Sequence, residues 1–79
     1  MKKVEIYSTP VCVYCNMAKD YFKKNNVTYT EYNVATDTTK RQEMMEKSGQ
    51  MGVPVIVVDN DNVVVGFDEK VLQDLLAIK

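Results

Sequence analysis

The chain has 79 residues, of which 46% are hydrophobic and 27% are charged. This composition predicts one globular domain over residues 1–79 rather than a disordered chain. Ten basic residues against eleven acidic ones leave a net charge of -1, so no basic face is expected for nucleic acid or an anionic membrane. No signal-peptide core is present, and no apolar run reaches the roughly 18 residues of a membrane helix. We expect a monomeric cytoplasmic protein.

Residue types that are missing exclude several kinds of catalytic site. The sequence contains no His and two Cys. Without an imidazole, the chain has neither a Ser-His nor a Cys-His nucleophile pair, and it has no histidine ligand for a metal. Two Cys alone cannot complete a four-ligand zinc site.

The first half of the chain predicts a strand, a helix and a second strand. Residues 4–7 are rich in β-forming residues, and Thr9-Pro10 ends the strand. Within residues 15–24, apolar side chains recur at helical spacing, and Asn25-Asn26 stops the helix. Residues 27–34 have a strongly β-forming composition. The apolar face predicted for the helix consists of Met17, Ala18, Tyr21 and Phe22.

The second half predicts a helix, a two-stranded hairpin and a last helix. Thr38 or Thr39 can cap the first of these helices, which ends near residue 48 before Gly49. Residues 55–58 and 63–65 are apolar strands joined by the turn at 59–62. Asp68 can cap the last helix. The buried stripe predicted for this helix consists of Val71, Leu72, Leu75, Leu76 and Ile78.

The element order β-α-β-α-β-β-α defines the expected α/β architecture. A strand, a crossover helix and a strand form a parallel pair. The hairpin near the end forms an antiparallel pair. We therefore expect one mixed four-stranded sheet flanked by three helices.

The segment Cys12-Val13-Tyr14-Cys15 carries two thiols about one helical turn apart, where the first strand leads into the first helix. A thiolate near a helix N-terminus gains hydrogen bonds from free amides and the positive end of the helix dipole. Lys19 adds a cation, and residues 10–19 contain no acidic side chain. These features make Cys12 the predicted nucleophile and Cys15 the resolving thiol of a disulfide exchange. Two inert, buried cysteines are the structural alternative.

Three motifs together resemble the glutaredoxin family of the thioredoxin superfamily, and the resemblance extends over the whole chain. They are Tyr7-Ser8-x-x-x-Cys12-x-Tyr14-Cys15, Gly52-Val53-Pro54 and Gly66-Phe67-Asp68. The resemblance implies the thioredoxin-like fold, with Cys12 as nucleophile and Cys15 as resolving thiol.

The resemblance also implies a substrate surface. Pro54 matches a proline that is cis in the family and lies against the active site. The backbone of Val53 would pair with a bound peptide, and Asp68 would bind the α-amino and carboxylate end of glutathione. We further expect substrate contacts at Tyr14 and Gly66.

Four positions depart from the usual family pattern. Val13 replaces a proline, Thr9 a basic residue, Gly52 a threonine and Val65 a glycine. The loss of the cation weakens recognition of the glycyl carboxylate of glutathione. Two electron donors therefore stay open, glutathione itself and a flavoprotein resembling thioredoxin reductase. The expected targets are proteins that contain disulfides, and no tightly bound cofactor is expected.

Two other functions would use the same thiols. A soft-metal carrier would bind Cu(I) between them. Heavy-metal domains with this motif, however, follow a β-α-β-β-α-β order and carry Met where this chain has Pro10. An iron-sulfur protein would share a cluster between two protomers and two glutathiones.

Overall fold

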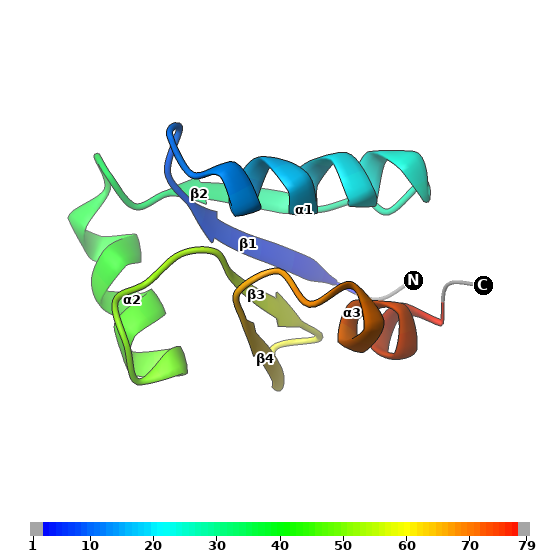
Figure 1. Cartoon of the computed structure of the whole chain (residues 1–79). Coiled ribbons are helices and arrows are strands. Elements are labelled where there is room, and N and C mark those ends of the chain that lie inside the picture. The colour runs from blue at the N-terminus through cyan, green and yellow to red at the C-terminus, as the bar shows by residue number, and fades with distance from the viewer. Residues whose placement is uncertain (1–2, 78–79) are drawn as a thin grey trace.

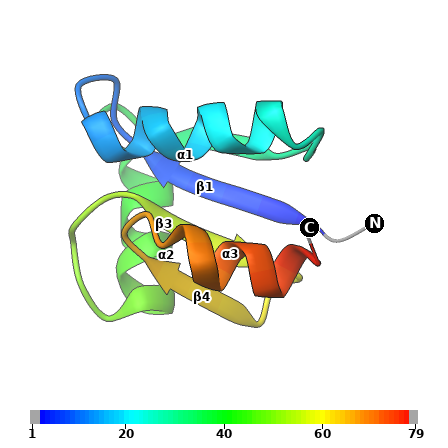
Figure 2. The same ribbon diagram turned by 45° about the vertical axis from the view of Figure 1, so that its right-hand side comes forward.

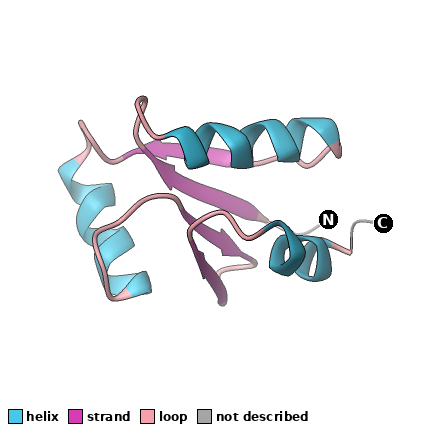
Figure 3. Cartoon of the chain, in the orientation of Figure 1, coloured by secondary structure: helices cyan, strands magenta, loops and turns pink. Residues whose placement is uncertain are grey.

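The computed structural model describes residues 3–77 and contains four strands and three helices in the predicted order (Figures 1 and 3). This confirms the α/β fold with a mixed sheet flanked by three helices. The elements are β1 (Val4–Ser8), α1 (Val13–Lys24), β2 (Thr30–Asn33), α2 (Thr38–Ser48), β3 (Val55–Val58), β4 (Asn62–Val65) and α3 (Glu69–Leu76).

The sheet has the strand order β2-β1-β3-β4. The inner strand β1 runs parallel to β2, with Ile6 opposite Glu31, and antiparallel to β3. β3 and β4 form the predicted antiparallel hairpin. In its turn, Asp59 and Asn60 have positive φ angles of 54° and 66°, which Asn and Asp tolerate better than other side chains.

Alternation along β1 directs its side chains to two cores on opposite faces of the sheet. Val4 and Ile6 pack with residues of α1 and α3, including Phe22 and Leu72. Tyr7 packs on the other face with Met44 of α2. Figure 2 shows α1 and α3 on the near side of the sheet, with α2 behind it. The sheet is therefore covered on both faces, as the predicted architecture requires.

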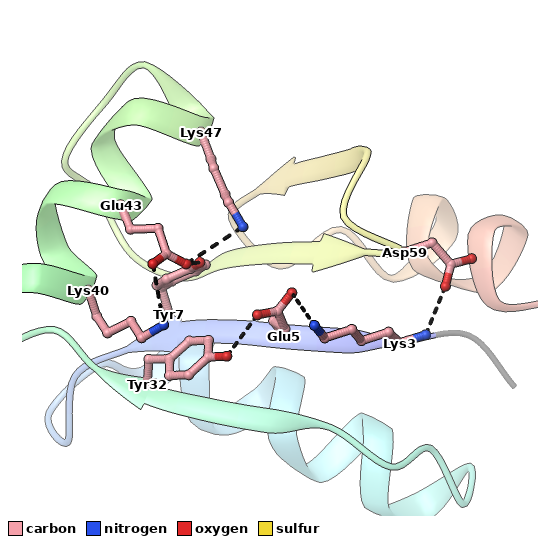
Figure 4. A network of polar contacts seen from close by, with 8 residues as sticks. All are labelled: Lys3, Glu5, Tyr7, Tyr32, Lys40, Glu43, Lys47 and Asp59. Atoms are coloured by element: carbon pink, nitrogen blue, oxygen red, sulfur yellow. Dashed lines mark hydrogen bonds and ion pairs between the residues drawn. The ribbon is translucent and has the colours of Figure 1, made fainter.

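The contact between α2 and the sheet is largely polar, because Met44 is the one residue of this helix that is fully buried. Figure 4 shows the side chains concerned. The Tyr7 hydroxyl of β1 donates to Glu43 Oε1 of α2 at 2.5 Å. Next to it, within the sheet, the Tyr32 hydroxyl of β2 donates to Glu5 Oε2 of β1 at 2.8 Å. The hydrogen bond from Tyr7 lowers the pKa of Glu43. The bond to Glu5, together with burial, raises the pKa of Tyr32 to about 12.

Several predicted boundaries were wrong. β1 extends to Ser8 and β4 begins at Asn62, each one residue beyond the predicted 4–7 and 63–65. α1 begins at Val13 and not at residue 15, because the apolar spacing becomes visible only after the first turn. β2 covers Thr30–Asn33 and not residues 27–34, because its partner β1 offers only four paired positions. The cap of α2 is Asp37 and not Thr38 or Thr39: Asp37 Oδ1 accepts from the amide of Lys40 at 3.0 Å.

The predicted apolar faces of two helices were partly wrong. Met17 on α1 is 45% exposed and Val71 on α3 is 40% exposed. Leu72 is fully buried, while Leu75 and Leu76 are partly buried against the same core. Ile78 lies outside the described residues. Among residues 3–77, no helix has the length and apolar character that crossing a membrane requires.

Candidate active site

Cys12 is the N-cap residue of α1. Its backbone is extended (φ −80°, ψ 113°), and its Sγ accepts a hydrogen bond from the amide of Cys15 at 3.2 Å. A sulfur thus occupies the place where Ser, Thr or Asp usually caps a helix. The first turn of α1 carries no acidic side chain. Because Cys12 is the N-cap, its half-buried side chain lies at the positive end of the α1 dipole, among amides with no partner inside the helix.

Cys15 differs from Cys12 in its access to solvent, since it is fully buried at the start of α1. Burial, followed by the hydrogen bond with Cys12, raises the pKa of the Cys15 thiol to about 12. The nearby Lys19 ammonium acts in the opposite direction on this pKa, but more weakly. Cys15 consequently holds its proton at neutral pH, and Cys12 is the more accessible of the two thiols.

Lys19 is paired with a carboxylate and is not a free cation beside the thiols. Its Nζ lies 2.8 Å from Glu31 Oε2, and this same oxygen accepts from the buried Ser8 hydroxyl at 2.9 Å. The hydrogen bond with Lys19 lowers the pKa of Glu31, and the same bond raises the pKa of Lys19. The ion pair links α1 to β2, and the hydrogen bond from Ser8 links β2 to the end of β1, just before the loop that leads to Cys12.

Pro54 and Gly66 lie side by side at the same end of the sheet. The Val53–Pro54 peptide bond is cis, as the resemblance implies, and Pro54 is fully buried. The Gly66 amide donates to the Pro54 carbonyl at 2.8 Å. Gly66 has a φ of 84°, a left-handed conformation that favours glycine.

Strand pairing brings this Pro54 region to the thiol end of the molecule. Tyr7 near the end of β1 pairs with Val55 at the start of β3, and Val55 pairs with Val65 at the end of β4. The start of α1, the loop before β3 and the loop after β4 therefore gather at one end of the sheet, as Figures 1 and 2 both show. All seven predicted site residues lie on these segments: Cys12, Tyr14 and Cys15 at the start of α1, Val53 and Pro54 before β3, and Gly66 and Asp68 after β4.

The backbone of Val53 is unpaired. Within residues 3–77, neither its N–H nor its C=O forms a hydrogen bond, although its side chain packs against the core under α2. Unpaired backbone groups beside a strand are available to another extended chain. This is the local geometry that the role implied for Val53 requires.

The other two predicted site residues are exposed. Tyr14, in the first turn of α1, is 62% exposed, and its neighbour Val13 is 68% exposed. Asp68 caps α3 by accepting from the amide of Val71 at 3.2 Å and bonds to no other predicted site residue. Cys12 is therefore followed in sequence by two exposed side chains, those of Val13 and Tyr14. The Asp68 carboxylate already accepts one hydrogen bond from its own helix.

Sequence reasoning did not identify Gln50 in the loop before Pro54. Its side-chain amide hydrogen-bonds to both backbone polar groups of Gly52. The only sequence signal is a glutamine two residues before a glycine, which predicts nothing by itself.

The part of the chain that the structure describes contains no group of three or more His, Cys, Asp or Glu side chains that could hold a metal ion. A four-coordinate metal on Cys12 and Cys15 would need further ligands from another molecule.

The chain has two thiols at the start of α1 and a cis proline on a loop at the same end of a four-stranded mixed sheet. These features define a dithiol protein of thioredoxin-like fold. The family model for Glutaredoxin matches residues 4–64. The chain belongs to the glutaredoxin family, and hence to the thiol-disulfide oxidoreductases in general.

Individual relatives agree with this assignment. An uncharacterized glutaredoxin-like 8.6 kDa protein in the rubredoxin operon of Clostridium pasteurianum is 42% identical over 73 residues, covering 92% of this chain and 96% of the relative. Glutaredoxin 3 of Escherichia coli is 35% identical over 63 residues, covering 80% and 76%. The crystal structure of a variant of the thioredoxin-like protein BC3987 matches all of both chains, with a TM-score of 0.90 and 38% identity.

Proposed function

We propose that the chain is a dithiol-disulfide oxidoreductase in which Cys12 is the nucleophile and Cys15 the resolving thiol. The observation that carries the proposal is the contrast between the two sulfurs. Cys12 Sγ is half-buried at the N-cap of α1 and accepts the Cys15 amide at 3.2 Å, whereas Cys15 is fully buried and its pKa is raised to about 12. The more accessible sulfur of Cys12 starts the exchange, and the buried sulfur of Cys15 completes it.

The exchange has two steps. The Cys12 thiolate attacks one sulfur of the substrate disulfide, so that a Cys12 mixed disulfide forms and the other substrate sulfur leaves as a thiolate. Cys15 then loses its proton and attacks Cys12, so that the Cys12–Cys15 disulfide forms and the second substrate sulfur leaves. Two electrons pass from the protein to the substrate, and glutathione could replace Cys15 in the second step.

The proposed substrate surface surrounds Cys12. Val53 offers its unpaired backbone to the peptide that carries the disulfide, beside Pro54 and Gly66. Tyr14 adds an exposed aromatic ring one residue beyond Val13. Asp68 would receive the amino end of a glutathionyl group. No tightly bound cofactor takes part, because the electrons enter and leave through sulfur.

Two electron donors fit this site. Glutathione would use Asp68 but would find Thr9 where a cation is usual, and Lys19 is engaged by Glu31. A flavoprotein resembling thioredoxin reductase needs neither contact. We propose that the chain acts as a monomer in the cytoplasm on proteins that contain disulfides.

Cysteine variants test the proposal. Cys12→Ser should abolish disulfide exchange and keep the fold, because serine is itself a good N-cap acceptor for the Cys15 amide. Cys15→Ser should keep the first step and lose the second, so that the Cys12 mixed disulfide accumulates and is seen by intact-protein mass spectrometry. Circular dichroism would check the fold of both variants. Substantial exchange by Cys12→Ser would refute the assignment of the nucleophile.

A coupled assay tests the donor. NADPH oxidation is followed with a small mixed disulfide, once with glutathione and glutathione reductase and once with thioredoxin reductase. Turnover in the first system only would assign glutathione as donor, and turnover in the second only would assign the flavoprotein.

A further inference from the structure

The side chain of Gln50 is bonded to the backbone of the loop before Pro54. Its Nε2 donates to the Gly52 carbonyl at 3.0 Å, and its Oε1 accepts from the Gly52 amide at 2.5 Å. One side-chain amide thus satisfies both polar groups of one residue, much as a neighbouring strand would. We call this pair of bonds the Gln50 clamp.

The Gln50 clamp is anchored to the end of α2. The Ser48 hydroxyl accepts from the Gln50 backbone amide at 3.4 Å and lies 2.9 Å from the Gln50 carbonyl. The same hydroxyl donates to the carbonyl of Met44, a fully buried residue, at 2.7 Å. The loop is therefore joined to Met44, the buried residue of α2, through a short chain of hydrogen bonds.

Gly52 is the residue that leaves room for the clamp. A Cβ built on Gly52 would lie 2.7 Å from Gln50 Oε1, closer than such atoms approach. The positive-φ glycines are Gly49 and Gly66, so the backbone of Gly52 does not itself demand glycine. The small residue at position 52, where the family commonly has threonine, is thus explained by the Gln50 side chain.

The clamp determines which backbone groups of the loop stay open. It occupies the N–H and C=O of Gly52, whereas those of Val53 have no partner within residues 3–77. Pro54, the next residue, has no N–H, and its carbonyl is taken by Gly66. In the segment 52–54, Val53 is consequently the residue whose N–H and C=O are both available to an extended peptide.

We propose that Gln50 is a positioning residue that holds Val53 for backbone pairing, and that it makes the protein favour disulfides borne on extended peptides over small disulfides. The inference rests on the proposed function, because it assumes that Cys12 carries out the exchange. The hydrogen bonds of Gln50 go to Ser48 and Gly52 and not to either sulfur. Gln50 acts through Gly52 on the one residue that pairs with the substrate.

The test compares two substrates that release the same chromophore from pre-reduced protein. One is a short peptide whose cysteine forms a mixed disulfide with thionitrobenzoate, and the other is dithiobis(nitrobenzoate), which has no peptide backbone. In both, Cys12 bonds to the sulfur it attacks and thionitrobenzoate leaves. Cys15 then closes the protein disulfide and releases the second thiol, so the protein loses two electrons. Stopped-flow absorbance yields a saturation constant and a limiting rate without any external electron donor.

Gln50→Ala should raise the saturation constant for the peptide about tenfold, equivalent to about 1.4 kcal/mol, with an unchanged limiting rate. Its reaction with dithiobis(nitrobenzoate) should be unchanged. Gln42→Ala is the matched control, because Gln42 is an exposed glutamine of α2 whose side chain, among residues 3–77, bonds to the Glu46 side chain alone. The control should behave as wild type with both substrates.

A second variant tests the link between Gln50 and Gly52. Gly52→Ala should displace the Gln50 side chain and reproduce the loss of peptide affinity. In the double variant Gln50→Ala/Gly52→Ala the two effects should not add, so the loss should stay near tenfold instead of reaching about a hundredfold. Additive losses would overturn the explanation of Gly52.

The outcomes separate this inference from the proposed function. If wild-type protein releases no chromophore from either substrate, the proposed function fails. If wild type is active and Gln50→Ala has an unchanged saturation constant for the peptide, the inference fails while the function stands. Equal slowing of Gln50→Ala with both substrates would also overturn the inference, because it would indicate a general structural role.

Discussion

The hydrogen bond between Tyr7 and Glu43 gives the sharpest test of the polar contact under α2. Tyr7→Phe removes a fully buried hydroxyl that donates to Glu43 Oε1 at 2.5 Å and leaves the ring in place. Glu43 keeps its ion pairs with Lys40 at 3.3 Å and Lys47 at 3.6 Å. Because the carboxylate stays paired and partly hydrated, we expect a loss near the lower end for charged hydrogen bonds, about 1.5 kcal/mol.

Thermal unfolding at pH 7 measures this loss. An unfolding entropy of about 2.1 cal/mol/K per residue converts it into a fall of about 9 °C in Tm for a chain of this length. Tyr14→Phe is the matched control, since its exposed hydroxyl has no hydrogen bond within residues 3–77. The control should stay within about 0.5 kcal/mol of wild type. A Tyr7→Phe variant as stable as the control would refute the reasoning.

Acidification should narrow the difference between Tyr7→Phe and wild type. The bond from Tyr7 is the largest cause of the lowered pKa of Glu43. A carboxyl group with a lowered pKa contributes stability that is present above its ordinary pKa of 4.5 and is lost as the pH falls through the folded value. Wild type has more of this stability to lose, so the two Tm values should converge as the pH falls below 4.5.

Three further predictions concern stability. Asp37→Ala should lower the free energy of unfolding, measured with urea, by about 1 kcal/mol, because it removes the N-cap of α2. Thr39→Ala should show no such loss, and the reverse result would favour the cap predicted from the sequence. Gly66→Ala should cost about 1 kcal/mol in the same assay because φ is 84° and the space for a Cβ is open, so an unchanged midpoint would contradict the left-handed backbone. Burial and the bond to Glu43 raise the pKa of Tyr7, and the bond to Glu5 and burial raise that of Tyr32, so stability should fall as the pH rises above about 10. A flat Tm between pH 9 and 11 would contradict this buried, hydrogen-bonded setting of the two hydroxyls.

Features that repeat along the chain were predicted well from sequence. The short β-forming runs and the helical spacing gave the element order, the parallel and antiparallel pairs, and Asp68 as the cap of α3. The two thiols are neighbours in sequence, so their place at the start of α1 followed from local structure alone. The cis bond before Pro54 came from the family resemblance, because no local signal distinguishes it.

Features that depend on a partner element were predicted poorly. The length of β2 is limited by β1, so the β-forming Val27 and Tyr29 pack against the core outside the strand. Helical spacing predicts which face of a helix is apolar but not how wide the buried part of that face is. Met17 and Val71 were therefore predicted to be buried, although they are partly exposed. The Gln50 clamp joins a side chain to a backbone two residues away and has no periodic signature.

The inner position of β1 has a consequence for how the chain is made. The core that contains Ile6 of β1 also needs Phe22 of α1, Ile56 of β3 and Leu72 of α3, so it draws on both ends of the chain. While the ribosome is still adding α3, the first β-α-β segment has an open strand edge and an uncovered apolar face. We therefore expect this domain to fold in one cooperative step once α3 is available, rather than piece by piece as its elements are made.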